Sequence, residues 1–420
     1  MQTIATGSQT PGAAEQATAE PVSESQRIVS LDVLRGFALL GILFINLPSM
    51  AMISAARTSP YAYLDATASD VRIWGALSVL ADGKFMAIFS MLFGAGTFLM
   101  ADRLDRSGTP AWPAYGRRLL FLFVVGMAHA YLLWHGDILV SYAICGATVF
   151  LFRKCGSRTL ILCAGIFFVI GMVTTVESGR AVGFAFRQLP EIFPTEVSPQ
   201  AETLAFRGRF MAQLPMRASY SFASQTVGFA ISSYWRIVAA MLLGIALIKG
   251  GYFAPGRKSV FFGKVALVAG LQIGIALAVC SVASLFYIGW DSYYGLLAYE
   301  LGNYLSSIPC ALGWIGAILL LMATGARAWL AHWVAPLGRM AFTNYLLQTI
   351  IGTTIFYGHG LGMFGKVHRA SLLLIAIGIW LFQLVLSAWW MSRFRFGPLE
   401  WLWRGFTYKK LPPIRRAVPA

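Results

Sequence analysis

Charged residues are scarce in this chain of 420 residues: they make up 12% of it, whereas hydrophobic residues make up 58%. A soluble domain averages about 25% charged residues. Half of that proportion does not cover the surface of a soluble protein of this size, which argues against a cytosolic enzyme and a disordered chain. Strict alternation of apolar and polar residues is also missing, which argues against an outer-membrane barrel. The mean hydropathy of +0.67 is instead typical of a polytopic helical membrane protein.

Cysteines and acidic residues are few as well. The chain has five cysteines, and none has the spacing of metal ligands, so we expect neither a disulfide framework nor a metal site. Its 17 Asp and Glu face 33 Lys and Arg, a formal charge of +16. The basic residues punctuate apolar runs and do not interleave with aromatics in a patch. They are therefore interpreted as topology signals, and no nucleic acid is expected as a partner.

About ten apolar runs are long enough to cross a bilayer, several of them at the short end of the range. They cover residues 36–56, 85–101, 119–134, 138–152, 160–176, 218–248, 265–290, 301–326, 333–357 and 370–392. The sequence thus predicts an all-α bundle with the lipid bilayer as its surroundings. The apolar segment 71–81 stops at Asp82 and Lys84, and we expect it to be an interfacial or re-entrant helix.

The domain organisation follows from these runs. Residues 1–26 contain no Lys or Arg and are expected to be a disordered tail, residues 27–408 the membrane domain, and residues 409–420 a basic cytoplasmic tail. With the N-terminus inside, about 22 of the basic residues fall on the cytoplasmic side and about 10 outside. Both termini are therefore predicted to be cytoplasmic. The outside connection 177–217 is the only sizeable extramembrane segment, and loops of such length often serve as lids.

Polar groups at membrane depth are costly, so each is a candidate for a functional site. Asp32 and Arg35 stand three residues apart on one helix face, and Asn46 follows Arg35 by eleven residues, which returns it to nearly the same face. The alternative for the first two is a salt bridge combined with a topology signal. Asp82 and Lys84 are expected where the second span begins on the outside, either lining a cavity mouth or marking the interface.

His129 is the sharpest candidate, because histidine is the usual general base near neutral pH. It is expected about two-thirds of the way across the third span. A very short outside turn then supplies His135 and Asp137, and a carboxylate close to a histidine can orient its ring and stabilise the imidazolium. We take His129 or His135 as a catalytic or proton-handling residue. The competing interpretation is a structural histidine satisfied within the core.

The ninth run carries Asn344, Tyr345 and Gln348, of which Asn344 and Gln348 share a face by their spacing. Substrate binding and hydrogen bonding between helices are equally consistent with that placement. The chain contains no glycine-rich phosphate loop, no carboxylate pair at glycosidase spacing and no HExxH motif.

Three stretches together resemble a known family. They are SLDVLRGFALLGIL at 30–43; DGKF and LFGAG within 82–96, with His129 and the turn that follows it; and GRMAFTNYLLQ at 338–348 with FGPLEWLWRGFTY at 396–408. The chain resembles the YeiB-like family of bacterial inner-membrane proteins, whose C-terminal half, about 230–408 here, carries a domain of unknown function (number 418). The resemblance implies a multi-pass protein of the bacterial inner membrane.

The N-terminal motif and the layout of helices are also similar to those of transmembrane acyltransferases. That similarity implies an acyl group taken from cytoplasmic acyl-CoA or acetyl-CoA and delivered to an acceptor across the membrane. The O-acyltransferases carry histidine eleven residues after the arginine of the first helix, where this chain has Asn46. The N-acetyltransferases carry a catalytic histidine in the first outside loop, and the loop 57–70 has none.

Three functions stay open. In an acyltransferase, Arg35, Arg117, Arg118 and Arg339 would meet the CoA phosphates, and His129 with Asp137 would deprotonate the acceptor. In a transporter of a small metabolite, lipid or peptide, the same groups would couple protons to movement. A non-catalytic partner in the cell envelope is the third. The first two predict that the polar side chains meet around one cavity. The acceptor and the oligomeric state stay open.

Overall fold

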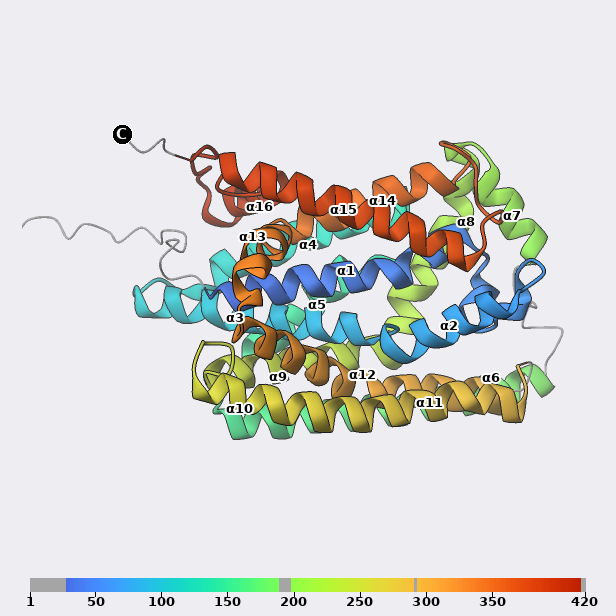
Figure 1. Cartoon of the computed structure of the whole chain (residues 1–420), viewed down its shortest axis with the longest axis horizontal. Helices are drawn as coiled ribbons and strands as arrows, with labels where there is room; N and C mark the ends of the chain where they lie inside the picture. The colour runs from blue at the N-terminus through green and yellow to red at the C-terminus, as the bar shows by residue number, and fades with distance from the viewer. Residues whose placement is uncertain (1–27, 189–197, 291–292, 417–420) are drawn as a thin grey trace, which may run out of the picture.

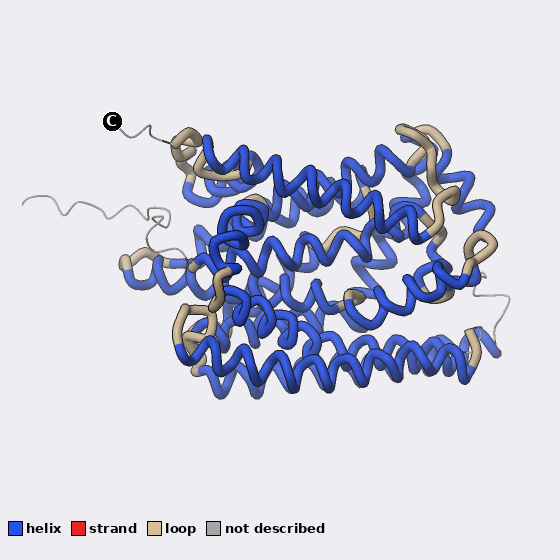
Figure 2. The backbone as a smooth tube through the Cα atoms, in the orientation of Figure 1, coloured by secondary structure: helices blue, strands red, loops and turns tan. Residues whose placement is uncertain are grey.

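The computed structural model describes residues 28–188, 198–290 and 293–416, which fold almost entirely as helices (Figure 2). Within these ranges no strand forms, and one isolated bridge pairs Phe394 with Arg415. The predicted tail 1–26 lies outside the described residues, as do residues 417–420 of the predicted basic tail. The all-α fold class is confirmed.

Eight helical segments are long and apolar enough to cross a membrane, which confirms a polytopic membrane protein. In chain order, the α-helices are α1 (Val29–Ala51), α2 (Ala68–Leu80), α3 (Lys84–Arg106), α4 (Ala111–Ala128), α5 (Leu139–Leu151), α6 (Ser157–Gln188), α7 (Pro199–Arg207), α8 (Phe210–Ala223), α9 (Tyr234–Lys249), α10 (Arg257–Val265), α11 (Leu271–Ile288), α12 (Tyr293–Met322), α13 (Ala326–Arg339), α14 (Ala341–Phe356), α15 (Arg369–Arg393) and α16 (Pro398–Tyr408). Three π-helical segments, η4 (His129–Leu133), η5 (Ser224–Ser233) and η6 (Ala266–Gly270), extend α4 and join α8 to α9 and α10 to α11.

The number of spans differs from the predicted ten or so. Two predicted runs correspond to shorter helices, α5 with 13 residues and α14 with 16. The run 333–357 is divided at Met340, where α13 ends and α14 begins. Polar residues such as Asn344 and Gln348 then lower the mean hydropathy of α14. A count of apolar run lengths does not detect such a break in direction.

Helices α2 and α3 are joined by a tight turn next to the apolar segment 71–81. A capping box starts α2: the Thr67 hydroxyl accepts from the Asp70 amide, and the Asp70 carboxylate accepts from the Thr67 amide. A turn with Gly83 at a φ of +76° joins α2 to α3, and Ala68–Arg106 counts as one apolar stretch of 39 residues. Figure 1 shows α2 continuing the course of α3. The segment 71–81 thus lies in a separate helix directly before α3, where its placement as an interfacial or re-entrant helix stays a prediction, and Lys84 at the break is completely buried.

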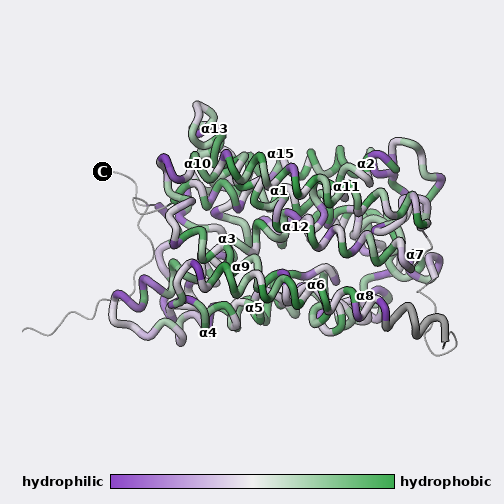
Figure 3. Tube along the Cα trace, turned by 90° about the horizontal axis from the view of Figure 1, so that it is seen from below, coloured by the Kyte–Doolittle hydropathy of each residue, from purple (hydrophilic) through white to green (hydrophobic). Residues whose placement is uncertain are grey.

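The helices form an elongated bundle around α1 (Figure 1). Helix α1 packs against α3, α13, α14 and α15, while α11 pairs with α12 and α6 with α9. The start of α1, the tip of α3, and α10, α13 and α16 lie at one end of the bundle, called here the α16 end. Helices α7 and α8 lie at the opposite end, the α7 end. Hydrophobic residues dominate the middle of the bundle, and hydrophilic ones gather toward both ends (Figure 3).

Close packing of α1 on α13 fixes the geometry of the α16 end. A Cβ atom on Gly36 would clash with the Val334 carbonyl, and one on Gly338 would clash with the Asp32 carbonyl. Only glycine allows the two backbones to approach so closely. This contact holds the first turns of α1 beside the last turn of α13, and so brings their charged residues together.

Candidate functional site

A cavity of about 300 Å³ opens inside the α16 end, between α1, α3, α4, α14 and α16. Along α1 it is lined from Ile28 to Ile42, which corresponds to about 21 Å of helix. Its inner part is mostly apolar, with Leu39, Phe89 and Leu122 among the lining residues. Five arginines stand against two carboxylates in the described lining: Arg35, Arg103, Arg118, Arg339 and Arg404, with Asp32 and Glu400. The cavity therefore suits a ligand with an anionic part and an apolar part.

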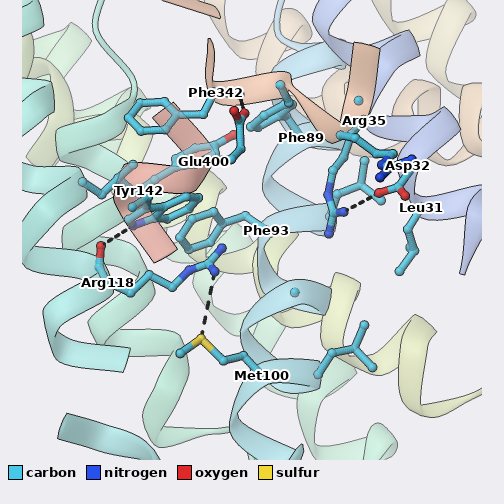
Figure 4. A pocket seen from close by; sticks show the side chains of 18 of the residues that line it. Leu31, Asp32, Arg35, Phe89, Phe93, Met100, Arg118, Tyr142, Phe342 and Glu400 are labelled. Atoms are coloured by element: carbon cyan, nitrogen blue, oxygen red, sulfur yellow. Dashed lines mark hydrogen bonds and ion pairs between the residues drawn. The ribbon is translucent and has the colours of Figure 1, made fainter. Parts of the chain in front are cut away.

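Arg35 and Asp32 form the ion pair that their spacing predicts. The Arg35 Nη1 lies 3.0 Å from the Asp32 Oδ1, and 30% of the Arg35 side chain stays exposed, against 8% for Asp32. Figure 4 shows the pair on one wall of the cavity. Arg35 is thus held by one neighbour and keeps donors available to a ligand.

Arg118 lies on the opposite wall, with its guanidinium directed into the cavity (Figure 4). The guanidinium carbon is 3.8 Å from the ring centre of Trp403, and Nη1 is 4.0 Å from the Met100 sulfur. No carboxylate of the described chain lies within ion-pair distance of it. The predicted arginines Arg35, Arg118 and Arg339 line the cavity, whereas Arg117 donates to the Thr407 carbonyl at 2.9 Å instead.

Glu400 anchors α16 against the bundle. Its carboxylate accepts from the Phe342 amide at 2.8 Å, the Thr343 amide at 3.1 Å and the Thr343 hydroxyl at 2.6 Å. These amides are free because they start α14, whose N-cap residue Met340 offers no side-chain acceptor. Burial raises the pKa of the Glu400 carboxyl. The sequence alone does not single out Glu400, although it follows Gly-Pro-Leu at a helix start, where acidic residues are favoured.

His129 and Asp137 meet, as the short turn between them suggests. The His129 Nδ1 lies 2.8 Å from the Asp137 Oδ1, the Asp137 Oδ2 accepts from the Val140 amide at 2.9 Å, and both side chains of the pair are fully buried. The His129 Nε2 lies 3.0 Å from the Thr349 hydroxyl, so both ring nitrogens have a hydrogen-bond partner. The result is a row of hydroxyl, imidazole and carboxylate, the order of a nucleophile, a base and an orienting acid. Thr349 was not anticipated.

Tyr345 separates this row from the cavity. It lines the cavity, its ring centre lies 5.2 Å from that of His129, and its hydroxyl donates to the Gly136 carbonyl at 3.3 Å. Ile138 and Leu139, which directly follow Asp137, line the cavity as well. These residues thus line the cavity on one side and cover the His129 site on the other.

Asn344 and Gln348 connect helices. The Asn344 amide donates to the Ser387 hydroxyl at 2.9 Å, and the Gln348 amide donates to the Gln383 side-chain oxygen at 2.9 Å. The Gln383 amide in turn donates to the Asn344 carbonyl at 2.9 Å. These buried bonds join α14 to α15, as the structural interpretation of the two residues predicted. Neither residue lines the cavity.

The remaining predicted residues lie elsewhere. The Lys84 ammonium donates to the Ser78 carbonyl at 2.8 Å, and the Asp82 carboxylate accepts from the Asn303 amide at 2.9 Å. Asn46 does not line the cavity, and His135 faces the Tyr220 ring at 5.1 Å, toward α8. The expectation of one shared cavity is therefore wrong: Asp32, Arg35 and Tyr345 line it, and the other predicted residues form separate clusters.

The fold and the cavity define the class: an all-α polytopic membrane protein with an arginine-lined cavity at one end. Among the described residues, no three His, Cys, Asp or Glu group together as metal ligands.

Comparison with known proteins gives the family. Residues 247–410 match the family described as "Protein of unknown function (DUF418)". The chain is 32% identical to the "Uncharacterized protein YxaH" of Bacillus subtilis (strain 168), over 94% of this chain and 98% of the relative. It is 28% identical to the "Uncharacterized protein YeiB" of Escherichia coli (strain K12), over 92% of this chain and 98% of that relative. The chain belongs to the YeiB-like DUF418 family.

Proposed function

We propose that this protein transfers an acyl group from acyl-CoA, bound at the α16 end, to an acceptor that approaches from the α7 end. The supporting observation is the cavity itself, which carries five arginines and ends at Tyr345, directly against the His129–Asp137 pair. The arginines that would bind an anionic group and the tyrosine that covers the His129 site thus line one cavity.

The α16 end is proposed to face the cytoplasm of a bacterium, with the bundle in the inner membrane. Basic residues gather around the turns from α3 to α4, α5 to α6 and α9 to α10, among them Arg103, Arg106, Arg153, Lys154 and Lys258. Cytoplasmic loops hold such an excess of Lys and Arg. Acyl-CoA is made and kept in that compartment, so the donor reaches the cavity directly.

The donor fits by charge and by size. Arg35, Arg118 and Arg339 present guanidinium groups suited to phosphates. A volume of about 300 Å³ is at the lower limit of ligand pockets, which favours a short acyl group such as acetyl with the nucleotide part left toward solvent.

In the proposed reaction, His129 carries one proton from the acceptor to the leaving thiolate, and one bond is exchanged at the thioester carbon. The acceptor's hydroxyl or amine replaces Thr349 at the His129 Nε2 and gives its proton to that nitrogen. The freed oxygen or nitrogen forms a bond to the thioester carbonyl carbon, the carbon–sulfur bond breaks, and the CoA thiolate takes the proton from His129. Asp137 holds the ring and stabilises the transient imidazolium. Tyr345 turns aside to let the thioester reach the ring.

The experiment is a label-transfer assay with radiolabelled acetyl-CoA and the purified full-length protein in nanodiscs, using extracts of the cell envelope as acceptor. His129→Gln should abolish transfer, and the exposed His332→Ala serves as the matched control with unchanged transfer. Equal transfer by His129→Gln and the unchanged chain refutes the role of His129. No transfer with any donor refutes the function.

A second function, proton-coupled transport, is supported by the break between α2 and α3 at 81–83, with Asp82 half-buried and Lys84 buried beside it. Transporters use broken helices whose ends surround the cargo. Proteoliposome uptake of a metabolite pool, driven by a pH gradient with no acyl donor, tests it. Uptake that is lost in Lys84→Met, with label transfer absent, would favour this second function.

A further inference from the structure

Arg217 of α8 is completely buried at the α7 end, and none of the described carboxylates lies within ion-pair distance of it. One of its terminal nitrogens donates to the Leu132 carbonyl, and the other donates to the Gln213 side-chain oxygen at 2.6 Å. Both acceptors are neutral, and Nε has no hydrogen-bond partner. The nearby carboxylate of Glu202 accepts from the amide and hydroxyl of Ser54.

A buried guanidinium in this state is expensive. Removing one charge from water is costly, and an ion partner is the usual compensation. The carbonyl and amide oxygens around Arg217 satisfy donors but supply no negative charge. A bound anion would therefore compensate the positive charge of Arg217.

Three further polar atoms near Arg217 are buried and unpartnered: the Tyr357 hydroxyl, the Trp134 Nε1 and the His135 Nδ1. Tyr357 and Trp134 are completely or almost completely buried. Two of the three are hydrogen-bond donors in any state, and His135 can donate from the same nitrogen. So many unsatisfied donors in one region are uncommon in a folded chain.

Two of the four residues, Tyr357 and His135, contact Phe206 of α7, and Arg217 and Trp134 adjoin these two. The Tyr357 ring stacks on Phe206 at 4.8 Å and lies 5.7 Å from the Arg217 guanidinium carbon. His135 lies 6.2 Å from Phe206 and 5.8 Å from Trp134. Burial and the charge of Arg217 lower the pKa of His135 to about 4, so this ring is neutral at pH 7 and Arg217 is the local cation.

We infer that the α7 end holds an anion-binding site formed by Arg217, Tyr357, Trp134 and His135, and that its ligand is an oxyanion, a carboxylate or a phosphate group. Donors spread over several side chains match an anion with more than one acceptor oxygen. The site lies at the opposite end from the arginine-lined cavity. It does not depend on acyl transfer.

The site borders the His129 cluster, since the Trp134 ring centre lies 6.3 Å from that of His129. An acidic group held here would therefore place its parent molecule on the α7 side of the His129–Asp137 pair. That molecule would carry a carboxylate or phosphate as its recognition mark.

The test is a titration of the full-length protein in phosphatidylcholine nanodiscs, followed by thermal unfolding at constant ionic strength. Sodium acetate, sodium phosphate and sodium chloride are compared. Acetate or phosphate should raise the unfolding temperature saturably, because a ligand that binds only the folded state stabilises it. A second set of nanodiscs with phosphatidylglycerol distinguishes the source: stabilisation there without added salts identifies a lipid phosphate as the ligand.

Tyr357→Phe removes only the unpartnered hydroxyl and should weaken the apparent affinity about tenfold, the effect of one hydrogen bond to a charged group. Tyr63→Phe is the matched control, because the Tyr63 hydroxyl is already bonded to the Val367 backbone. Arg217→Gln should abolish the response, and Tyr357→Phe decides the matter if that variant does not fold. Three results overturn the site: no saturable response to either oxyanion in both kinds of nanodisc, a response to chloride alone, or an unchanged response in Tyr357→Phe.

Discussion

Replacing Glu400 by alanine tests how α16 is held on the bundle. The carboxylate is the acceptor for the Phe342 and Thr343 amides in the first turn of α14 and for the Thr343 hydroxyl. Alanine leaves these three donors without a partner inside the protein. Losing a helix cap costs about 0.5–2 kcal/mol, and stranding a buried donor costs about 1–3 kcal/mol. Because α16 can still partly rehydrate, we expect a net loss of about 1–3 kcal/mol in the free energy of unfolding.

The assay combines thermal unfolding in nanodiscs with amide hydrogen exchange. The alanine variant should unfold a few degrees lower, and exchange should rise in α16 and in the first turn of α14 but not in α11. Glu400→Gln keeps one acceptor oxygen and should show a smaller change. Glu177→Ala is the control, since Glu177 is exposed and pairs with Arg180 at 3.1 Å. Unchanged protection of α16 in the alanine variant would refute this account of its anchoring.

Further predictions concern the site, the pH response and the helix contact. Asp137→Asn should reduce acyl transfer about a thousandfold or more in the label assay, because an amide no longer favours the proton on the His129 Nδ1. Burial raises the pKa of the Glu400 carboxyl above its ordinary 4.5, so the folded protein keeps this proton to a higher pH than the unfolded chain does. The free energy of unfolding should therefore fall as the pH rises just above 4.5. Glu400→Gln should remove this part of the pH dependence of unfolding. Gly338→Ala should lower the unfolding temperature by an overpacking cost of about 1–3 kcal/mol, whereas Gly325→Ala, with no heavy atom within 4 Å of its added Cβ, should not.

Features that depend on near neighbours in the chain could be predicted from the sequence. The spans follow from apolar runs, the Asp32–Arg35 pair from a spacing of three, and the His129–Asp137 pair from a short turn. The shared helix face of Asn344 and Gln348 could also be predicted, because residues i and i+4 lie together on a helix.

Features that depend on which helices become neighbours could not be predicted. Glu400 meets α14 across more than fifty residues of chain, and Thr349 reaches His129 from another helix. Hydropathy reports the length of an apolar run but not its partner. The same limit led to the expectation of a single cavity, since the sequence does not show that Lys84 finds its acceptor at the break between α2 and α3.

The π-helical turn at His129 links the two ends of the molecule. Its wider winding leaves carbonyls free at Ala130 and Leu132, and α8 supplies both donors, the Ser221 hydroxyl at 2.9 Å and the Arg217 guanidinium. A molecule that displaces α8 by even one hydrogen-bond length withdraws both donors at once and frees the turn to rewind. Rewinding by one residue would rotate the imidazole away from Thr349, so a change at the α7 end would alter the surroundings of a histidine buried inside the bundle.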